Sequence, residues 1–344
     1  MKIGNFDTDE KILIVAEIGN NHEGSVALAE EMIGLAAESG ADAVKFQTIV
    51  PEKLVSILQT ERIEQLKKFQ FSHREIEKLA GVARQENVLF LSTPFDIESA
   101  RFLEPIVPAY KIASGDNNFY PLIETVASTG KPIIMSVGIL TTEEVRRTRT
   151  YIRNIWKENG IEQNMALLHC VVSYPTPIGD ANLLAIKKLK KLDEVVGYSD
   201  HTIGIEAAVL SVTLGARIIE KHFTISKDYS NFRDHALSAD PNDLKRLVER
   251  VRDAIKLLGT GEKRIMDSEK ETLELVRRSI AASRDLMAGS VLTMEDIDWI
   301  RPGEGLAPGR EKEILGKVLV KSVQKGERIL PKHFLNIKAK DGDL

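Results

Sequence analysis

Two histidines occur where a metal site could form. His201 and His222 each follow directly on a short, largely apolar run, VVGYSD and RIIEK. If these runs are neighbouring strands of one sheet, the two neutral imidazoles lie side by side and fit a divalent transition metal such as Mn, Fe, Co or Zn. A single histidine in such a place is more often a hydrogen-bonded core residue, which is how we interpret His169 in the run LLHC. We expect Cys170 to be a small core residue.

Two lysines, Lys45 and Lys111, lie inside apolar runs, where an unpaired ammonium is costly. Each could simply pair with a carboxylate of the same interior, such as Glu17 or Glu220. Two lysines at one opening with hydroxyl groups nearby instead favour a pocket for a phosphate or carboxylate. Lysine supplies a point charge there, and hydroxyls supply directed donors. The hydroxyl side chains near these strand ends belong to Thr93, Ser114 and Ser136.

These polar residues need a scaffold that brings their strand ends together. Short runs rich in Val, Ile and Leu alternate with amphipathic stretches such as 25–39, 72–86 and 242–258. Continuous apolar runs are typical of parallel strands buried on both faces. Eight such units over roughly 250 residues predict a (β/α)8 TIM barrel, whose chemistry lies at the C-terminal strand ends. An open doubly wound sheet is the alternative, but no G-x-G-x-x-G follows the first run. The expected strands are 12–17, 42–48, 88–93, 109–113, 132–137, 165–171, 194–199 and 216–221.

The pattern changes after the barrel-sized region. A polar, charged stretch covers 259–275, and beyond it the segments 284–297 and 321–334 resemble each other at an offset of 37. Such internal similarity predicts a small domain with two related halves. We therefore expect a catalytic barrel over 1–260, a linker over 261–276 and a small domain over 277–344.

The composition excludes several classes of protein. A net charge of −4 argues against a general nucleic-acid binder, and a single cysteine excludes an internal disulfide. No apolar run is long enough to span a membrane, and the N-terminus lacks the apolar core of a signal peptide. We therefore expect a cytoplasmic protein that neither crosses a membrane nor binds nucleic acid.

Eight short motifs are distributed over nearly the whole chain. GYSDHTIG together with EKHFT is a highly specific combination, whereas the first motif alone would be weak. The motifs are AEIGNNHEG (16–24), GADAVKFQT (40–48), STPFD (92–96), YKIASGD (110–116), HCVVSYPTP (169–177), GYSDHTIG (197–204), EKHFT (220–224) and RPGEG (301–305).

In this order the motifs resemble the N-acetylneuraminate (sialic acid) synthases and their relatives that make legionaminic and pseudaminic acids. The resemblance implies a TIM barrel followed by a small antifreeze-like (SAF) domain. It implies a transferase that condenses phosphoenolpyruvate (PEP) with N-acetylmannosamine or a related amino-sugar and water. The products would be a nine-carbon sugar acid and phosphate. It also implies a divalent metal, Mn²⁺ in the first place, with Mg²⁺ or Co²⁺ as alternatives.

The resemblance further implies roles for individual residues. His201 and His222 would bind the metal, and Glu17 would act as an acid or base. Tyr174 and Asp234 would contact the sugar, with Gln47 as a polar contact near the metal. Arg301 would reach the sugar from the partner subunit of a domain-swapped homodimer. The residues expected to hold PEP are Lys45, Thr93, Lys111, Ser114, Ser136 and Ser199, and the two lysines also count as catalytic.

Three positions depart from the family's pattern. Asp116 replaces the usual glutamate after KIASG, Val172 replaces a residue that is polar in some members, and Arg233 replaces the proline before Asp234. Asp116 remains a candidate for substrate binding, and Arg233 puts the identity of the sugar in doubt. Two other functions stay open at this point. One is a Schiff-base aldolase or lyase on a sugar acid with Lys111 or Lys45 as nucleophile, and the other is a non-catalytic carbohydrate-binding assembly protein.

Overall fold

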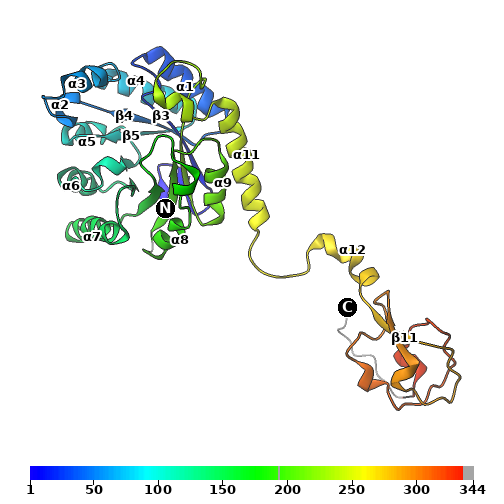
Figure 1. Ribbon diagram of the computed structural model, residues 1–344. Helices are drawn as coiled ribbons and strands as arrows, with labels where there is room; N and C mark the ends of the chain where they lie inside the picture. Colours follow the sequence, from blue (N-terminus) through cyan, green and yellow to red (C-terminus); the bar gives the residue numbers. More distant parts are fainter. Residues whose placement is uncertain (193, 336–344) are drawn as a thin grey trace. The chain divides into compact units, whose positions relative to one another are not determined.

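A computed structural model describes residues 1–192 and 194–335 and divides the chain into two compact units, Met1–Gly259 and Thr260–Leu344 (Figure 1). The first unit contains an eight-stranded parallel sheet in the order β5-β4-β3-β10-β9-β8-β7-β6. β5 and β6, at the two ends of this order, pack against each other and close the barrel. The strands are β3 (Leu13–Gly19), β4 (Ala43–Thr48), β5 (Leu89–Pro94), β6 (Tyr110–Ile112), β7 (Ile133–Ser136), β8 (Met165–Cys170), β9 (Val195–Asp200) and β10 (Ile218–His222).

The predicted TIM barrel is confirmed, with a strand in each of the eight expected runs. Alternate residues of each strand face opposite ways, because side chains in a strand alternate with a period of two. On β3, for example, Leu13 and Val15 join the small apolar cluster inside the barrel, whereas Ile14 and Ala16 pack in the larger cluster beneath the helices. The hairpin β1 (Lys2–Ile3) and β2 (Phe6–Asp7) adds Met1 and Ile3 to the inner cluster.

Helices surround the sheet. Serine and threonine caps start two of the longer ones: Ser72 and Glu75 form a capping box before α4, and Thr141 and Glu144 form one before α7. None of the described helices has the length and apolar character that crossing a membrane requires. The helices of the first unit are α1 (Val26–Glu38), α2 (Pro51–Leu54), α3 (Thr60–Lys67), α4 (His73–Gln85), α5 (Ile97–Leu103), α6 (Tyr120–Ser128), α7 (Thr142–Glu158), α8 (Ala185–Leu189), α9 (Glu206–Thr213), α10 (Arg233–Leu237) and α11 (Pro241–Leu258), with 3-10 turns η1 (Ser114–Asp116), η2 (Ile178–Asp180) and η3 (Lys190–Leu192).

The second unit shows the two related halves that the sequence predicts. Leu286 and Val323, which correspond at the offset of 37, form an antiparallel bridge in which each N–H lies 2.8 Å from the other's carbonyl oxygen. Gly289 and Gly326 both adopt a positive φ, 89° and 80°. Corresponding positions of the two halves therefore pair with each other or share a backbone conformation. The elements are α12 (Asp267–Val276), which lies within the expected linker, β11 (Ser279–Ala282), η4 (Met294–Asp296), β12 (Ile297–Ile300), η5 (Glu311–Glu313) and η6 (Pro331–His333). Residues 336–344 of the expected small domain lie outside the described residues.

Candidate active site

A cavity of about 290 Å³ opens at the C-terminal ends of the barrel strands. Each of the eight strands contributes at least one polar or sulfur-bearing side chain to its wall. Every predicted site residue except Asp116 and Arg301 lines this cavity. The predicted residues that line it are Glu17, Lys45, Gln47, Thr93, Lys111, Ser114, Ser136, Tyr174, Ser199, His201, His222 and Asp234.

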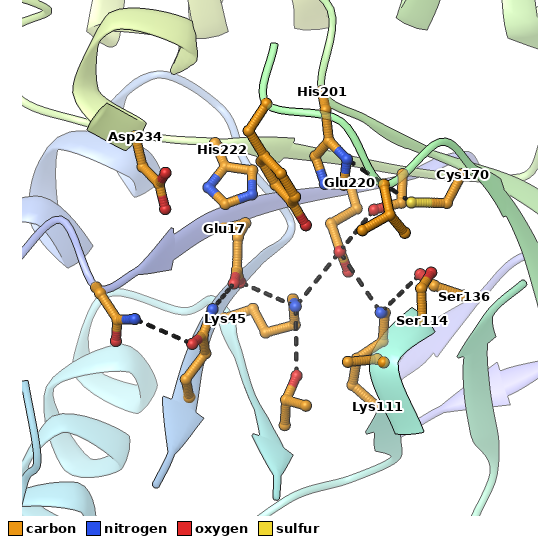
Figure 2. Close-up of a pocket in the computed structure, with 18 of the residues that line it drawn as sticks. Glu17, Lys45, Lys111, Ser114, Ser136, Cys170, His201, Glu220, His222 and Asp234 are labelled. Carbon is orange, nitrogen blue, oxygen red and sulfur yellow. Dashed lines mark hydrogen bonds and ion pairs between the residues drawn. The ribbon is translucent and has the colours of Figure 1, made fainter. Parts of the chain in front are cut away.

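The two buried lysines share one carboxylate partner, Glu220, in the depth of the cavity (Figure 2). Lys45 Nζ lies 3.0 Å from Glu17 Oε2 and 3.3 Å from Glu220 Oε1, and Lys111 Nζ lies 3.6 Å from Glu220 Oε1. Burial alone would lower the pKa of Lys45, but Glu17 and Glu220 outweigh it and hold this pKa above its usual range. Burial lowers the pKa of Lys111 against the attraction of Glu220. Both lysines are thus paired with carboxylates and also line the cavity.

Hydroxyl groups surround this network at the positions that the sequence predicts. Lys111 Nζ donates to Ser136 Oγ at 2.8 Å, and Lys45 Nζ donates to Thr93 Oγ1 at 3.4 Å. Ser199 donates to Glu220 at 3.0 Å, while Ser114 Oγ accepts from the backbone N–H of Gly138 at 3.0 Å. Two ammonium groups and several hydroxyls around one space can hold an anion with several oxygens.

Glu17 is the carboxylate best placed for proton transfer. It is 2% exposed, and its Oε1 accepts a hydrogen bond from Gln47 Nε2 at 3.2 Å. Asn20 in turn donates to Gln47 Oε1 at 3.2 Å. Burial raises the pKa of Glu17 against the pull of Lys45, and the negative charge of Glu220 adds to the rise. Burial tends to raise the pKa of Glu220 as well. Lys111 and Lys45 outweigh this effect, so the pKa of Glu220, unlike that of Glu17, is lowered.

His201 and His222 lie side by side above the lysines (Figure 2), with ring centroids 5.3 Å apart. Tyr174 packs against both rings. His201 Nδ1 lies 2.8 Å from the carbonyl oxygen of Val171, which leaves its Nε2 for a ligand. His222 Nδ1 is buried and has no hydrogen-bond partner in the described part of the chain. Burial lowers the pKa of both histidines, most strongly that of His222, which favours the neutral form of both rings.

This pair fits a divalent cation, because neutral imidazole nitrogens are good ligands and an orphaned buried nitrogen needs a partner. Within the described residues, no group of three or more His, Cys, Asp and Glu side chains is arranged as a metal site. The remaining coordination positions of such an ion would therefore be open to substrate oxygens or water.

The mouth of the cavity carries Arg233 and Asp234 from α10 and Arg62 from α3. The Arg233 guanidinium lies 5.1 Å from the centroid of the Tyr174 ring, and its Nε is 3.1 Å from Asp234 Oδ1. Arg233 is 67% exposed, yet it faces the cavity rather than only shaping the loop. Nothing in the sequence pointed to Arg62.

Some candidates lie elsewhere. Asp116 ends η1 just beyond the lining residue Gly115, and burial raises its pKa to about 6. Arg301 belongs to the second unit and is exposed, without a side-chain partner among residues 1–192 and 194–335.

His169 faces the helices and its Nε2 lies 2.9 Å from the carbonyl oxygen of Ala181, so it is structural as expected. Cys170 is buried as expected of a small core residue, and burial raises the pKa of its thiol. It also lines the cavity, 3.8 Å from His201 Nδ1.

Comparison with known proteins gives consistent matches. The NeuB family profile matches residues 32–263 and the SAF domain profile residues 277–335. An uncharacterized protein of Methanocaldococcus jannaschii is 44% identical over 299 residues, which cover 86% of this chain and 87% of that protein. N,N'-diacetyllegionaminic acid synthase of Legionella pneumophila is 38% identical over 336 residues, or 93% and 94% of the two chains. The crystal structure of sialic acid synthetase from Leptospira borgpetersenii matches 80% of this chain and 95% of its own with a TM-score of 0.73 and 35% identity.

Proposed function

The chain belongs to the NeuB family, and on that premise we propose that it condenses PEP with an N-acetylated amino-sugar and water to give a nonulosonic acid and phosphate. The observation that carries the proposal is the buried arrangement of Lys45 and Lys111 among hydroxyl groups, directly beneath two neutral histidines. A multiply charged anion and an aldehyde could be held there side by side.

In the proposed reaction, C3 of PEP forms a bond to the aldehyde carbon of the acceptor. Lys45 and Lys111 hold the phosphate and carboxylate of PEP and fix C3 against that carbon. Water then adds to C2, and the tetrahedral intermediate expels inorganic phosphate by breaking the C2–O bond. Glu17 accepts a proton from this water or moves the proton of the sugar hydroxyl, a role suited to a carboxylate whose pKa burial raises.

We propose that His201 and His222 hold a divalent cation, Mn²⁺ in the first place. When bound there, the ion would act as a Lewis acid on the aldehyde oxygen. Tyr174 packs against both rings and would keep them in place, while Asp234 and Arg233 face the space left for the sugar.

Phosphate release from PEP that requires an amino-sugar would support the proposed reaction. The rival with a specific observation in its favour is a Schiff-base mechanism on Lys111, because burial lowers the pKa of that lysine. Borohydride trapping with pyruvate separates the two. Covalent labelling of Lys111 without any PEP-dependent phosphate release would favour the rival.

We expect Arg233 to take part in choosing the acceptor. Arginine offers five donors and a permanent charge where proline offers none, so it can bind a phosphate or an acetamido group of a 6-phosphorylated or diacetamido hexose. Arg233→Pro should shift relative kcat/KM toward plain N-acetylmannosamine by about tenfold, since losing a charged hydrogen bond costs about 1.5 kcal/mol. A panel of acceptors read by mass spectrometry measures this shift. An unchanged order of preference would exclude Arg233 from acceptor choice.

We also expect a homodimer in which the small domain of one subunit completes the barrel site of its partner through Arg301. Arg301→Ala subunits mixed with His222→Ala subunits should then regain activity, because one composite site of the mixed dimer has both residues intact. Native mass spectrometry would verify that mixed dimers formed. Verified mixed dimers without activity would contradict the swap.

A further inference from the structure

A partly buried contact joins the first and last loops at the C-terminal face of the barrel. His235, in α10, is fully buried, and its Nε2 lies 3.0 Å from Oε1 of Glu23 in the loop between β3 and α1. The other ring nitrogen, Nδ1, lies 2.6 Å from Thr224 Oγ1 at the start of the loop that follows β10. Both nitrogens of one buried imidazole thus bind loops that are far apart in the sequence.

Glu23 makes this contact from a strained backbone. Its φ is 47°, a value that residues other than glycine seldom adopt. The turn has little freedom to relax, because the next residue, Gly24, passes so close to α3 that a Cβ there would lie 2.1 Å from the carbonyl oxygen of Lys68. Strain of this kind persists only where the surroundings fix it, and it gathers at functional sites. Here it directs the Glu23 carboxylate toward the last loop, where Ser230 Oγ also donates to it.

A second set of bonds ties the same two loops together. Asn21 Nδ2 donates to the carbonyl oxygen of Phe223 at 2.8 Å and to Ser238 Oγ at 2.9 Å. Ser238 Oγ in turn donates to the carbonyl oxygen of Asp234 at 2.5 Å. The first loop therefore holds segment 223–238 at both ends and, through Glu23, in the middle.

We propose that Glu23 and His235 form a latch that positions Asp234 and Arg233 toward the acceptor sugar, and that neither latch residue touches substrate itself. Asp234 and Arg233 immediately precede His235 on α10 and line the mouth of the cavity, whereas neither Glu23 nor His235 lines it. The proposal rests on the proposed condensation and names the residues that set its acceptor affinity. Because the lysines beneath belong to other strands, the latch acts on the acceptor and not on PEP.

Two substitutions of Glu23 separate the latch from a merely structural turn. Glu23→Gly accommodates the positive φ but removes the carboxylate, so a turn that needs only its backbone shape would keep wild-type kinetics. The latch predicts a rise of about tenfold or more in the KM for the acceptor, as expected for losing a hydrogen bond to a charged group, with the KM for PEP within about twofold. Glu23→Gln keeps an acceptor oxygen for His235 and should restore most of the affinity.

The matched control is Glu194→Gln, which weakens a different carboxylate contact between distant segments, to Arg149 and Arg153, before the start of β9. It should lower stability without changing the ratio of the two KM values. Hydrogen exchange in segment 223–238, measured without substrates, should be faster in Glu23→Gly than in wild type and unchanged in Glu194→Gln.

An unaltered acceptor KM in Glu23→Gly, or an equal rise in both KM values, would overturn the latch. Unaltered exchange in 223–238 would overturn it as well. Wild-type protein that turns over no amino-sugar would instead refute the proposed function, and the exchange experiment would still decide whether the latch exists.

Discussion

His222→Ala should lower kcat by about 10³-fold or more, because it removes one of two imidazoles that would hold a Lewis acid worth several kcal/mol of transition-state stabilisation. The fold should survive, since His222 Nδ1 gives up no hydrogen bond within the described residues. His201→Ala should have a similar effect. Exhaustive dialysis against EDTA should inactivate the wild-type protein, and Mn²⁺ should restore it.

The control for this prediction is His169→Asn, which changes a buried histidine of the same barrel that faces the helices instead of the cavity. Calorimetric titration with Mn²⁺ should show binding to wild type and to His169→Asn, and weak or no binding to His222→Ala. Full activity after complete chelation would rule out the metal site, and so would equal Mn²⁺ affinity in all three proteins.

Glu17→Gln should lower kcat by about 10²- to 10⁴-fold, the range typical of removing a general acid or base. Glutamine keeps the size of the side chain and leaves Lys45 its second partner, Glu220, so PEP should still bind with a similar KM. The pH profile supplies the sharper readout. A base must be deprotonated to act, so the wild-type rate should fall as pH drops through the raised pKa of Glu17.

This fall in rate, the acidic limb of the pH–rate profile, should lie at a higher pH than an ordinary carboxyl group would give. It should disappear in Glu17→Gln. Glu220→Gln is the comparison, because the two lysines keep the pKa of Glu220 low and its titration lies outside the working range. The acidic limb should therefore persist in Glu220→Gln, whatever the maximal rate of that variant. A limb that remains in Glu17→Gln would assign the proton transfer to another group.

The barrel could be predicted because its strands are continuous apolar runs, and the small domain because paired glycines mark its two halves. Which way a given side chain faces was harder to predict. In a run that is apolar on both faces, period-two alternation leaves no visible pattern, so His169 and Cys170 could not be assigned to opposite faces from sequence. The structure turns His169 toward the helices and Cys170 into the cavity.

The contacts between loops also escaped sequence reasoning. Arg62 belongs to the inserted segment around α2 and α3, where no motif indicated a functional residue. Which carboxylates pair with Lys45 depends on how the strands are aligned. The last strand, β10, pairs with β3, and this brings Glu220 within reach of Lys45. Such long-range pairings are fixed by the closure of the barrel rather than by any local pattern.

The central claim is tested most directly by running the reaction with PEP, an amino-sugar and Mn²⁺ in water enriched in ¹⁸O, followed by mass spectrometry of both products. The proposed addition of water to C2 places one ¹⁸O in the nine-carbon acid and none in the released phosphate. Label in the phosphate would mean that the P–O bond breaks and would contradict the proposed addition of water to C2. Phosphate release that does not need the sugar would mean that the protein merely hydrolyses PEP and would contradict the proposed condensation.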